Sequence, residues 1–309
     1  MDQPLPESAV CAVLVSYHPD VAAVAAAVGR LRACQVDVVV VDNGSGADTV
    51  GALREVVEPA GGVVIALPDN MGVAAAQNAG IRHAATQAAD FVLLLDQDSL
   101  PAEDMVLQLL RAECDLTAQG HRVGAIGPVT IDSRTGAQAS FVRFAGIRIG
   151  RHRCESTTST VAVDFLIASG MLIALPVLRH VGGMSEDLFI DHVDTEWCIR
   201  ARNLGYGLFG ACAARLDHTL GDRVVRIWFG RWREVAVHSP ARHYYVFRNT
   251  LLMLHRTPMP LAWRVAQLLR LLQFFVFFIA VGAPRRERLR YMLRGIVDGL
   301  RNRGGQYCV

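Results

Sequence analysis

Two clusters of carboxylates are the residues of this sequence best suited to chemistry. Asp96-Gln97-Asp98 directly follows an apolar run, and Asp191-His192-Val193-Asp194 stands about 90 residues later, where a helical pattern begins. Carboxylate oxygens are the ligands that Mg2+ and other hard cations prefer, and such cations are commonly shared with substrate phosphates. The first cluster therefore predicts a metal-bound diphosphate. Because neighbouring aspartates can also merely cap a turn, their position in the fold matters.

Apolar runs with polar ends place the first cluster at the edge of a sheet. Buried strands are predicted over Val10–Ser16, Val36–Val41, Val63–Leu67 and Phe91–Leu95, with a fifth over Val123–Val129. Helical patterns separate them, which favours βαβ units and a mostly parallel sheet flanked by helices. The first four strands end in Ser16-Tyr17-His18, Asp42-Asn43-Gly44-Ser45, Asp69-Asn70-Met71-Gly72 and Asp96-Gln97-Asp98. Since parallel strands end at one edge, these residues predict a nucleotide site there.

Missing motifs exclude several classes of nucleotide-binding protein. No Gly-x-Gly-x-x-Gly follows the first strand and no Walker sequence occurs, which argues against dinucleotide oxidoreductases and P-loop NTPases. A sugar nucleotidyltransferase needs a glycine-rich basic loop after the first strand, and Ser16-Tyr17-His18-Pro19-Asp20 is not one. A non-catalytic, membrane-associated nucleotide-sugar-binding protein stays open as an alternative, although it would not need Asp98 and Asp194 together.

Composition bounds the location and the partners. The 309 residues are 52% hydrophobic and 19% charged, so the chain can bury a sizeable core. A formal net charge of +2 gives no reason to expect a nucleic-acid partner. The seven cysteines include no Cys-x-x-Cys pair, so we expect neither a disulfide framework nor a zinc site, as suits a reducing cytosol. Met1–Ser8 carries no signal-peptide pattern, which also favours a cytoplasmic location.

The C-terminal part differs in character. Leu271–Ala283 is apolar except for Gln273 and is too short to cross a bilayer as a usual helix, and Arg264 and Arg270 interrupt its upstream extension. Residues 284–309 hold seven arginines, one Glu and one Asp, a net charge of +5 against −3 for the rest. A helical apolar stripe within them comprises Leu289, Met292, Leu293, Ile296, Val297 and Leu300. This pattern suits a helix in an anionic membrane interface, or an ordinary packing or dimer helix.

A series of short motifs resembles a known family. In chain order they are Val13-Leu14-Val15-Ser16-Tyr17, Val41-Asp42-Asn43-Gly44-Ser45, Asn70-Met71-Gly72, Gln77-Asn78-Ala79-Gly80, Leu95-Asp96-Gln97-Asp98-Ser99, Ser169-Gly170-Met171, Asp191-His192-Val193-Asp194-Thr195-Glu196-Trp197-Cys198 and Arg200-Ala201-Arg202-Asn203-Leu204-Gly205-Tyr206. Over roughly residues 10–250 the chain resembles the family 2 glycosyltransferases of GT-A fold. It is most similar to bacterial rhamnosyltransferases, on Asp-Gln-Asp-Ser, Asp194-Thr195-Glu196-Trp197-Cys198 and His238-Ser239-Pro240-Ala241-Arg242-His243-Tyr244-Tyr245 followed by Arg248-Asn249.

The resemblance implies a division of the chain. Residues 1–250 form the catalytic domain, with a nucleotide-sugar-binding part over about 1–130 and an acceptor and catalytic-base part over 131–250. Residues 251–309 form a helical, basic extension that associates with a membrane or with a partner subunit.

It also implies roles for single residues. Asp98 and Asp96 bind Mg2+ or Mn2+ on the diphosphate, with His218 as a third ligand unless it is structural. The nucleotide sugar contacts Ser16, Tyr17, Asp42, Asn43, Asn70, Gly72, Asn78, Asp96 and Gln97. The general base is Asp194 first and Asp191 second, because relatives carry Glu-Asp where this chain has Val193-Asp194. Trp197, Glu196 and Arg242 contact the acceptor or the transferred sugar. The structural alternatives are a buried core position for Trp197 and a helix N-terminal charge for the acids of residues 191–196. Arg242, Arg248 and Asn249 either hold phosphate or brace the end of the domain.

The implied reaction is an inverting, metal-dependent glycosyl transfer. The donor is a nucleoside-diphosphate sugar, first of all dTDP-rhamnose, and the alternative is another hexosyl or galactofuranosyl transfer from a UDP-sugar. The acceptor is a hydroxyl of a lipid-linked or polysaccharide glycan of the cell envelope, reached from the cytoplasmic face of the inner membrane. A carboxylate base is needed because such a hydroxyl is a poor nucleophile until it loses its proton.

Overall fold

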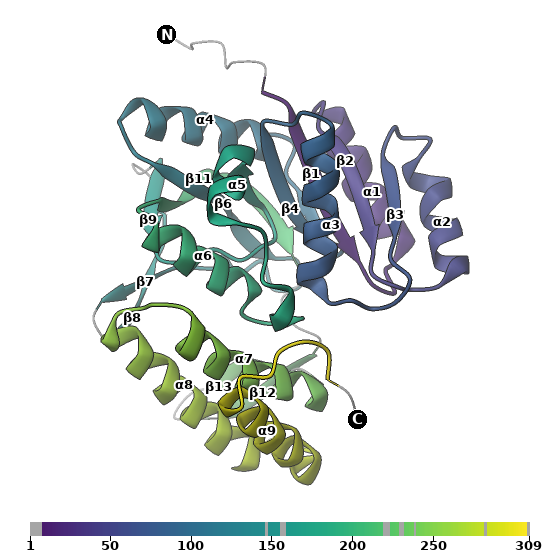
Figure 1. Cartoon of the computed structure of the whole chain (residues 1–309). Coiled ribbons are helices and arrows are strands. Elements are labelled where there is room, and N and C mark those ends of the chain that lie inside the picture. The colour runs from purple at the N-terminus through teal and green to yellow at the C-terminus, as the bar shows by residue number, and fades with distance from the viewer. Residues whose placement is uncertain are drawn as a thin grey trace.

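The structure, a computed structural model, describes residues 8–145, 148–154, 159–218, 223–228, 232–237, 239–280 and 283–307. An α/β body lies above a layer of three long helices, α7, α8 and α9 (Figure 1). His238 of the family motif lies outside the described residues.

A nine-stranded sheet forms the body. Its strands are β1 (Val10–Ser16), β2 (Asp37–Asp42), β3 (Val63–Ala66), β4 (Phe91–Asp96), β5 (Ser99–Pro101), β6 (Val123–Asp132), β9 (Thr160–Val163), β10 (Met171–Ala174) and β11 (Gly207–His218). The order is β3-β2-β1-β4-β10-β6-β11-β5, with β9 on β11. The first four strands are parallel as predicted, and β6 is parallel to β11. β10, β5 and β9 run antiparallel to their neighbours, so the sheet is mixed.

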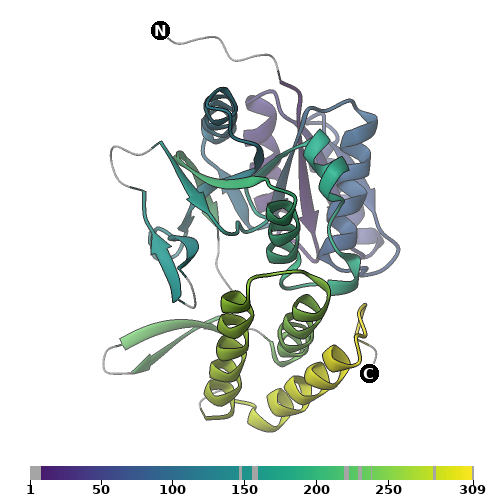
Figure 2. The ribbon, with the colours of Figure 1, turned by 60° about the vertical axis from the view of Figure 1, so that its left-hand side comes forward.

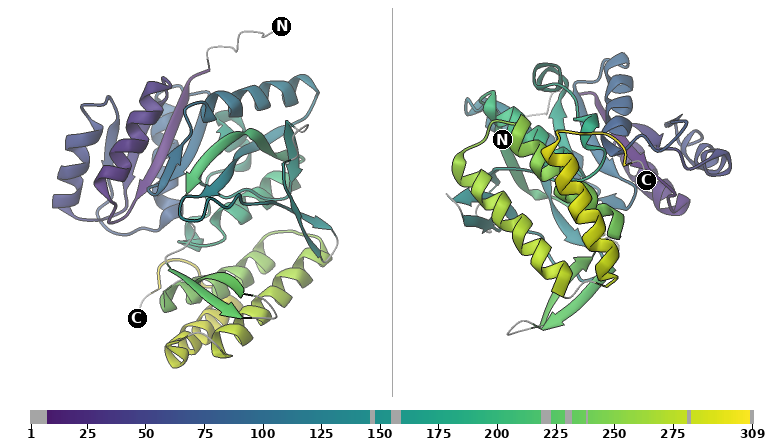
Figure 3. Two further views of the ribbon diagram at one scale, coloured as in Figure 1. Left: turned by 180° about the vertical axis from the view of Figure 1, so that it is seen from behind. Right: turned by 60° about the horizontal axis from the view of Figure 1, so that its bottom comes forward.

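Helices cover both faces of the sheet because its strands are apolar on both faces. Along β1, Cys11 and Val13 face one core cluster, and Ala12 and Leu14 face the other. The first cluster includes residues of α3 (Val73–Thr86), α5 (Leu175–Val181) and α6 (Val193–Asn203). The second includes residues of α1 (Val21–Ala33), α2 (Ala47–Val57) and α4 (Met105–Ala118). The left view of Figure 3, from behind, shows the face that α1, α2 and α4 cover.

Two antiparallel hairpins lie outside this sheet. β7 (Phe141–Ala145) pairs with β8 (Arg148–His152), and β12 (Arg223–Trp228) pairs with β13 (Trp232–Val237). The first falls in the polar stretch that the sequence predicted to be irregular or short-stranded, and the second follows β11. In Figure 2 the β12–β13 hairpin projects beside the helical layer.

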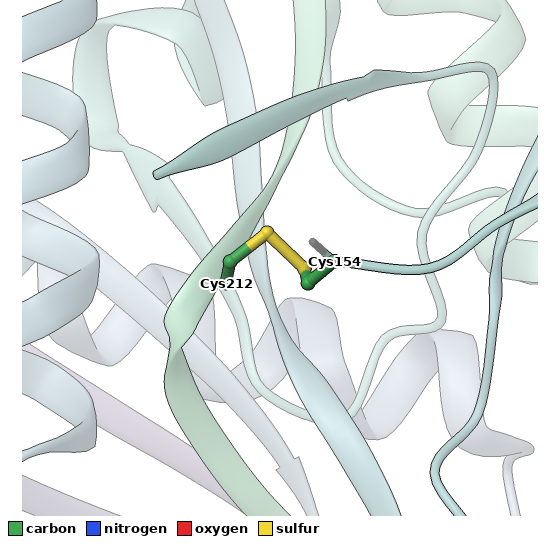
Figure 4. Close-up of a disulfide and its surroundings, with 2 residues drawn as sticks. All are labelled: Cys154 and Cys212. Atoms are coloured by element: carbon green, nitrogen blue, oxygen red, sulfur yellow. A yellow bond between two sulfur atoms is a disulfide. The ribbon is translucent and has the colours of Figure 1, made fainter. Parts of the chain in front are cut away.

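A disulfide corrects the expectation drawn from the cysteine spacing. Cys154, just after β8, is bonded to Cys212 of β11, which lies 58 residues later (Figure 4). The Cys212 amide also donates to the Ser159 carbonyl. Local spacing shows only pairs that are close in sequence, whereas these two cysteines meet through the fold. The other cysteines of the described residues are free: Cys11, Cys34, Cys114 and Cys198.

The C-terminal layer comprises α7 (Pro240–Arg256), α8 (Leu261–Ala280) and α9 (Arg285–Leu300). α9 packs closely on α7 at Gly295, which has no side chain. A Cβ at this position would lie only 2.4 Å from the Tyr244 carbonyl oxygen. Of the apolar stripe predicted for α9, Met292 is buried, whereas Leu293, Val297 and Leu300 are exposed.

α8 is longer than its predicted apolar core. It begins at Leu261, so its 20 residues have the length and hydropathy of a membrane span, and the estimate of a segment too short to cross a bilayer is wrong. Only 17% of its most apolar 18-residue window is buried. Length and composition alone are weak evidence for a membrane helix.

Candidate active site

Three side chains from two sheet elements form a metal-ligand cluster. Asp96 ends β4, Asp98 follows in the turn to β5, and His218 ends β11. The antiparallel pairing of β5 with β11 sets His218 opposite Ser99 and so brings it to the two aspartates. One ligand atom from each of Asp96, Asp98 and His218 lies within 4.8 Å of the others. Two carboxylates and one imidazole suit a divalent cation, so the residues fit the predicted metal.

Hydrogen bonds orient the imidazole of His218. Its Nδ1 lies 2.9 Å from the Ser99 hydroxyl and 3.3 Å from a carboxylate oxygen of Asp98. Burial opposes protonation of His218, but the hydrogen bond and charge of Asp98, with the charge of Asp96, leave its pKa raised. A cation bound by the aspartates would displace that proton and leave a neutral nitrogen as a ligand.

Asp96 connects this cluster electrostatically to the second acidic cluster. Burial raises the pKa of Asp96 to about 6, the charge of His218 lowers it, and the charges of Asp98 and Asp194 raise it further. Asp194 therefore lies close enough for its charge to act on the metal-ligand cluster. The two clusters, about 90 residues apart in sequence, are therefore neighbours in the fold.

The segment Ala168-Ser169-Gly170 lies between Asp194 and the metal-ligand cluster. The backbone N–H of Ala168 donates to the Asp194 carboxylate. The Asp96 N–H donates to the Ser169 hydroxyl at 3.2 Å, and that hydroxyl lies 2.5 Å from the hydroxyl of Ser99. The family motif Ser169-Gly170-Met171 was the available signal for this bridge, but the sequence did not show what it touches.

Asp194 and Asp191 have different surroundings. Asp194 lies in the first turn of α6, where its carboxylate accepts from the Thr195 N–H at 2.7 Å and from the Thr195 hydroxyl at 3.3 Å. Burial outweighs these bonds and raises the pKa of Asp194. Asp191 instead receives both carboxylate contacts from Nε of Arg242, at 3.0 and 3.1 Å. A second Arg242 nitrogen lies 3.0 Å from the same carboxylate.

The strand ends at the nucleotide edge are linked by polar contacts. Asp42 is fully buried and accepts from the hydroxyls of Ser16 at 3.3 Å and Ser45 at 2.5 Å. Asn43 donates to the Asn70 side chain at 3.0 Å, which in turn accepts from the Gly72 N–H. The Gln97 side chain accepts from the Tyr17 N–H at 2.6 Å, so the ends of β1 and β4 are held together. These predicted nucleotide residues therefore share one edge.

Three other predicted site residues lie in packing positions. Asn78 of α3 bonds to Met184 and to Glu186, at 2.8 to 2.9 Å, away from the strand ends. Trp197 is fully buried, and its indole N–H donates to the Gly182 carbonyl at 2.9 Å. Glu196 is buried and accepts from Arg200 at 2.8 and 3.0 Å. Trp197 therefore offers no open face for a sugar in this structure.

A cavity of about 540 Å³ lies at the opposite end of β6 and β11. Its lining includes Arg122, Arg143, Tyr206 and Trp263 and none of the predicted site residues. Arg122 and Arg202 of this lining stack over Tyr206 and Trp263, each at 4.7 Å. This cavity is therefore separate from the acidic site.

Comparison with known proteins agrees with the geometry. Residues 14–159 match the model of the family described as Glycosyl transferase family 2. The chain is 30% identical over 304 residues to the dTDP-rhamnosyl transferase RfbF of Shigella flexneri, covering 97% of this chain and 99% of that protein. It is 27% identical over 221 residues to the galactofuranosyltransferase GlfT1 of Mycobacterium tuberculosis, covering 68% and 70%.

Solved structures share the fold. One is the mannosyltransferase PcManGT from Pyrobaculum calidifontis in complex with GDP-Man and Mn2+, with a TM-score of 0.55, 15% identity and coverage of 97% of this chain and 91% of that one. Another is S. aureus TarS in complex with UDP-GlcNAc, with a TM-score of 0.58, 14% identity and coverage of 95% and 81%. The fold is therefore GT-A. With the full-length similarity to RfbF, this chain belongs to the family 2 glycosyltransferases.

Proposed function

We propose that the protein is an inverting, metal-dependent rhamnosyltransferase that uses dTDP-rhamnose. The observation that carries the reaction class is the joint position of the metal-ligand cluster and Asp194, whose charge acts on Asp96. The observation that favours the sugar is the 30% identity, over nearly the whole length of both chains, to a dTDP-rhamnosyl transferase.

Asp96, Asp98 and His218 would hold Mg2+ or Mn2+. The cation, as a Lewis acid, stabilises the negative charge that develops on the departing nucleoside diphosphate. The aspartates and His218 would set where that cation lies, and Ser99 orients His218 through its 2.9 Å contact. The nucleoside lies along the strand-end residues Ser16, Tyr17, Asp42, Asn43, Asn70, Gly72 and Gln97. Asn78 braces α3 against residues 184–186 instead.

Asp194 accepts the proton of the acceptor hydroxyl as the new glycosidic bond forms. A raised pKa makes a carboxylate a stronger base, and burial raises that of Asp194. Asp191 is the weaker candidate because Arg242 already occupies its oxygens. In-line attack on the anomeric carbon, opposite the departing diphosphate, inverts that centre without a covalent sugar–enzyme intermediate.

The division of labour along the chain follows the same proposal. Residues 1–130 bind the nucleotide sugar, residues 131–250 supply the base and the acceptor side, and residues 251–309 form the extension. Glu196 and Trp197 stabilise the α5–α6 layer, and Arg242 holds Asp191. The acceptor is a hydroxyl of a lipid-linked or polysaccharide glycan.

The extension supports a peripheral position at the cytoplasmic face of the inner membrane. α8 exposes Leu261, Leu268, Leu269, Leu272 and Val276 along one helix. The net charge of +5 after residue 283 favours an anionic surface over a second, equally basic copy of this chain. A membrane-bound enzyme of this kind would meet a polyprenyl-linked acceptor directly.

A galactofuranosyl transfer from a UDP-sugar is the second candidate, because GlfT1 matches about two thirds of the chain. A donor panel separates the two. With metal present, dTDP-rhamnose, UDP-galactofuranose, UDP-glucose and GDP-mannose are compared for release of the nucleoside diphosphate. We expect the fastest release from dTDP-rhamnose. Faster turnover of UDP-galactofuranose would replace the proposed sugar, and no release from any donor would count against the transferase itself.

A further inference from the structure

The loop that leads into α6 has an unusual backbone. Phe189, Asp191 and His192 all have positive φ, at 64°, 64° and 62°. Residues with a Cβ adopt this conformation rarely and only where surrounding contacts impose it. The loop runs directly into Asp194, the second residue of α6. Whatever holds this backbone therefore sets the position of the proposed base.

The contacts come from two consecutive buried residues of α7. The Nδ2 amide of Asn249 lies 2.8 Å from the Leu188 carbonyl oxygen, 2.7 Å from that of Ile190 and 2.9 Å from that of Asp191. Only the amide nitrogen can donate to carbonyls, so the orientation of this side chain is defined by its partners. Asn249 has no solvent-accessible surface and therefore does not touch a substrate.

Arg248 orients the Asn249 side chain and adds further hydrogen bonds to the loop. Its Nε donates to Oδ1 of Asn249 at 2.9 Å, which turns the amide nitrogen toward the loop. Its Nη2 donates to the carbonyls of Leu188 at 2.9 Å and Asp187 at 3.1 Å, and its Nη1 donates to the Gly305 carbonyl. Arg248 is also fully buried, and its guanidinium lies over the rings of Tyr244 and Tyr245.

The same loop also touches the nucleotide edge. The Phe189 carbonyl accepts from the Val73 N–H at 2.8 Å, at the start of α3. A Cβ at Gly72, one residue earlier, would lie 2.6 Å from that carbonyl oxygen. Residues 187–192 are thus held between α7 on one side and the nucleotide-binding part on the other.

We propose that Arg248 and Asn249 are positioning residues, which hold the loop 187–192 so that Asp194 meets the acceptor hydroxyl above the donor. This role rests on Asp194 being the base, as in the proposed function. The proposal extends the catalytic machinery to α7. The sequence alone did not decide whether Arg248 and Asn249 hold phosphate or brace the end of the domain, and the proposal gives them a different role. The pair acts through backbone carbonyls, and it neither contacts the donor nor changes the metal ligands.

The sharpest variant is Asn249→Asp, which keeps the volume and replaces the donating amide by an acceptor. The three loop carbonyls would then face an oxygen. We expect kcat to fall on the order of 100-fold, as a displacement of about 1 Å in an active site typically costs. The dissociation constant for dTDP with Mn2+ should change far less than kcat, because the loop reaches the nucleotide edge only at Phe189, through its hydrogen bond from the Val73 N–H. Arg248→Lys, which loses the fork of donors, should give a smaller kcat loss of the same kind and serves if N249D does not fold.

Phe247→Leu is the matched control. Phe247 is buried on the same helix, but it packs in the cluster with Phe278 and Met292 and not against the loop. The melting temperature of this variant should fall, as expected for a smaller side chain in a packed core, while kcat stays within about twofold of the wild type. If N249D and F247L lower kcat equally at equal loss of stability, the effect is structural and the positioning role is wrong.

A double-variant comparison separates this inference from the proposed function. If Asn249 acts through Asp194, N249D should cost no further activity in a D194N background, whereas an independent structural effect would multiply. Full turnover of D194N alone would overturn the assigned base. Loss of turnover in D194N together with normal turnover in N249D would overturn only the positioning role.

Discussion

The carboxylate of Asp194 lies in surroundings that disfavour its own charge. Burial raises its pKa although it accepts hydrogen bonds from Thr195 and Ala168. In the native state the group holds its proton to a higher pH than in the unfolded chain, whose Asp pKa is about 3.9. Between these two values the native state binds more protons, so the stability contributed by this group falls as pH rises and stays lost above the raised pKa. The ionised carboxylate that the proposed reaction needs is therefore the form of Asp194 that destabilises the native state.

Asp194→Asn should therefore separate the two properties. The variant should lose transfer by a factor on the order of 10² to 10⁴, as expected for a missing general base, and keep dTDP–Mn2+ binding. Its unfolding free energy, measured in urea, should exceed that of the wild type at pH 8, and the difference should disappear toward pH 4. Asp115→Asn on the exposed side of α4 is the control and should change neither property. Lower stability of D194N at pH 8 would contradict the assigned environment.

The sequence could place Asp96 and Asp98 at the end of a strand because hydrophobic runs with polar ends are readable patterns. Asp96 and Asp98 follow an apolar run, and that run became β4 with a boundary one residue later than predicted. The sequence could not place Trp197, whose aromatic ring suits a sugar platform and a core equally. Nor could it show what Asn249 contacts, because its partners are backbone carbonyls about 60 residues away.

At the scale of elements, the non-local pairings are what the sequence did not predict. β5 has only three residues, yet its antiparallel pairing with β11 sets the position of His218. The bond between Cys154 and Cys212 likewise depends on where the β8 end meets β11, which no spacing rule shows. The parallel strands β1 to β4 were predictable because each follows from its own hydrophobic run.

The contact of α9 with α7 gives a prediction at this scale. A Cβ at Gly295 would meet the backbone oxygen of Tyr244 at 2.4 Å, and backbone cannot yield as a side-chain end can. Gly295→Ala should lower the unfolding free energy by about 1–3 kcal/mol. Gly29→Ala in α1, where a Cβ would meet nothing within 4 Å, should be neutral or stabilising by up to about 1 kcal/mol. Chemical denaturation measures both, and a neutral G295A would show that the two helices separate easily.

At the scale of the whole molecule, charge and exposed apolar surface coincide in one region. α8 leaves Leu272 58% and Val276 59% exposed, and the chain after residue 283 carries a net +5. The sequence located the basic tail but assigned the interfacial stripe to α9, part of which packs inward at Met292. Hydrophobic periodicity shows that a helix has an apolar face and not whether another helix covers it.

Vesicle binding tests the membrane proposal. The protein should co-sediment with vesicles of phosphatidylglycerol and phosphatidylcholine, and high salt should weaken the binding. The double variant Leu272→Glu with Val276→Glu should weaken it about tenfold or more, because charges replace buried apolar contacts. Leu107→Glu, at an exposed leucine of α4, is the control and should bind normally. If the double variant binds vesicles normally, or if it instead splits a dimer in sedimentation, the surface serves a second copy of the chain.

Metal-dependent nucleotide binding tests the central claim most directly. Titration calorimetry of dTDP is compared with Mn2+ and with EDTA, in the wild type, in Asp98→Ala and in the control Asp115→Ala. If Asp96, Asp98 and His218 hold a cation on the diphosphate, Mn2+ should tighten dTDP binding about tenfold or more in the wild type and the control. The Asp98→Ala protein should lose that gain. Equal affinity with Mn2+ and EDTA in the wild type, or an undiminished gain in Asp98→Ala, would contradict the account.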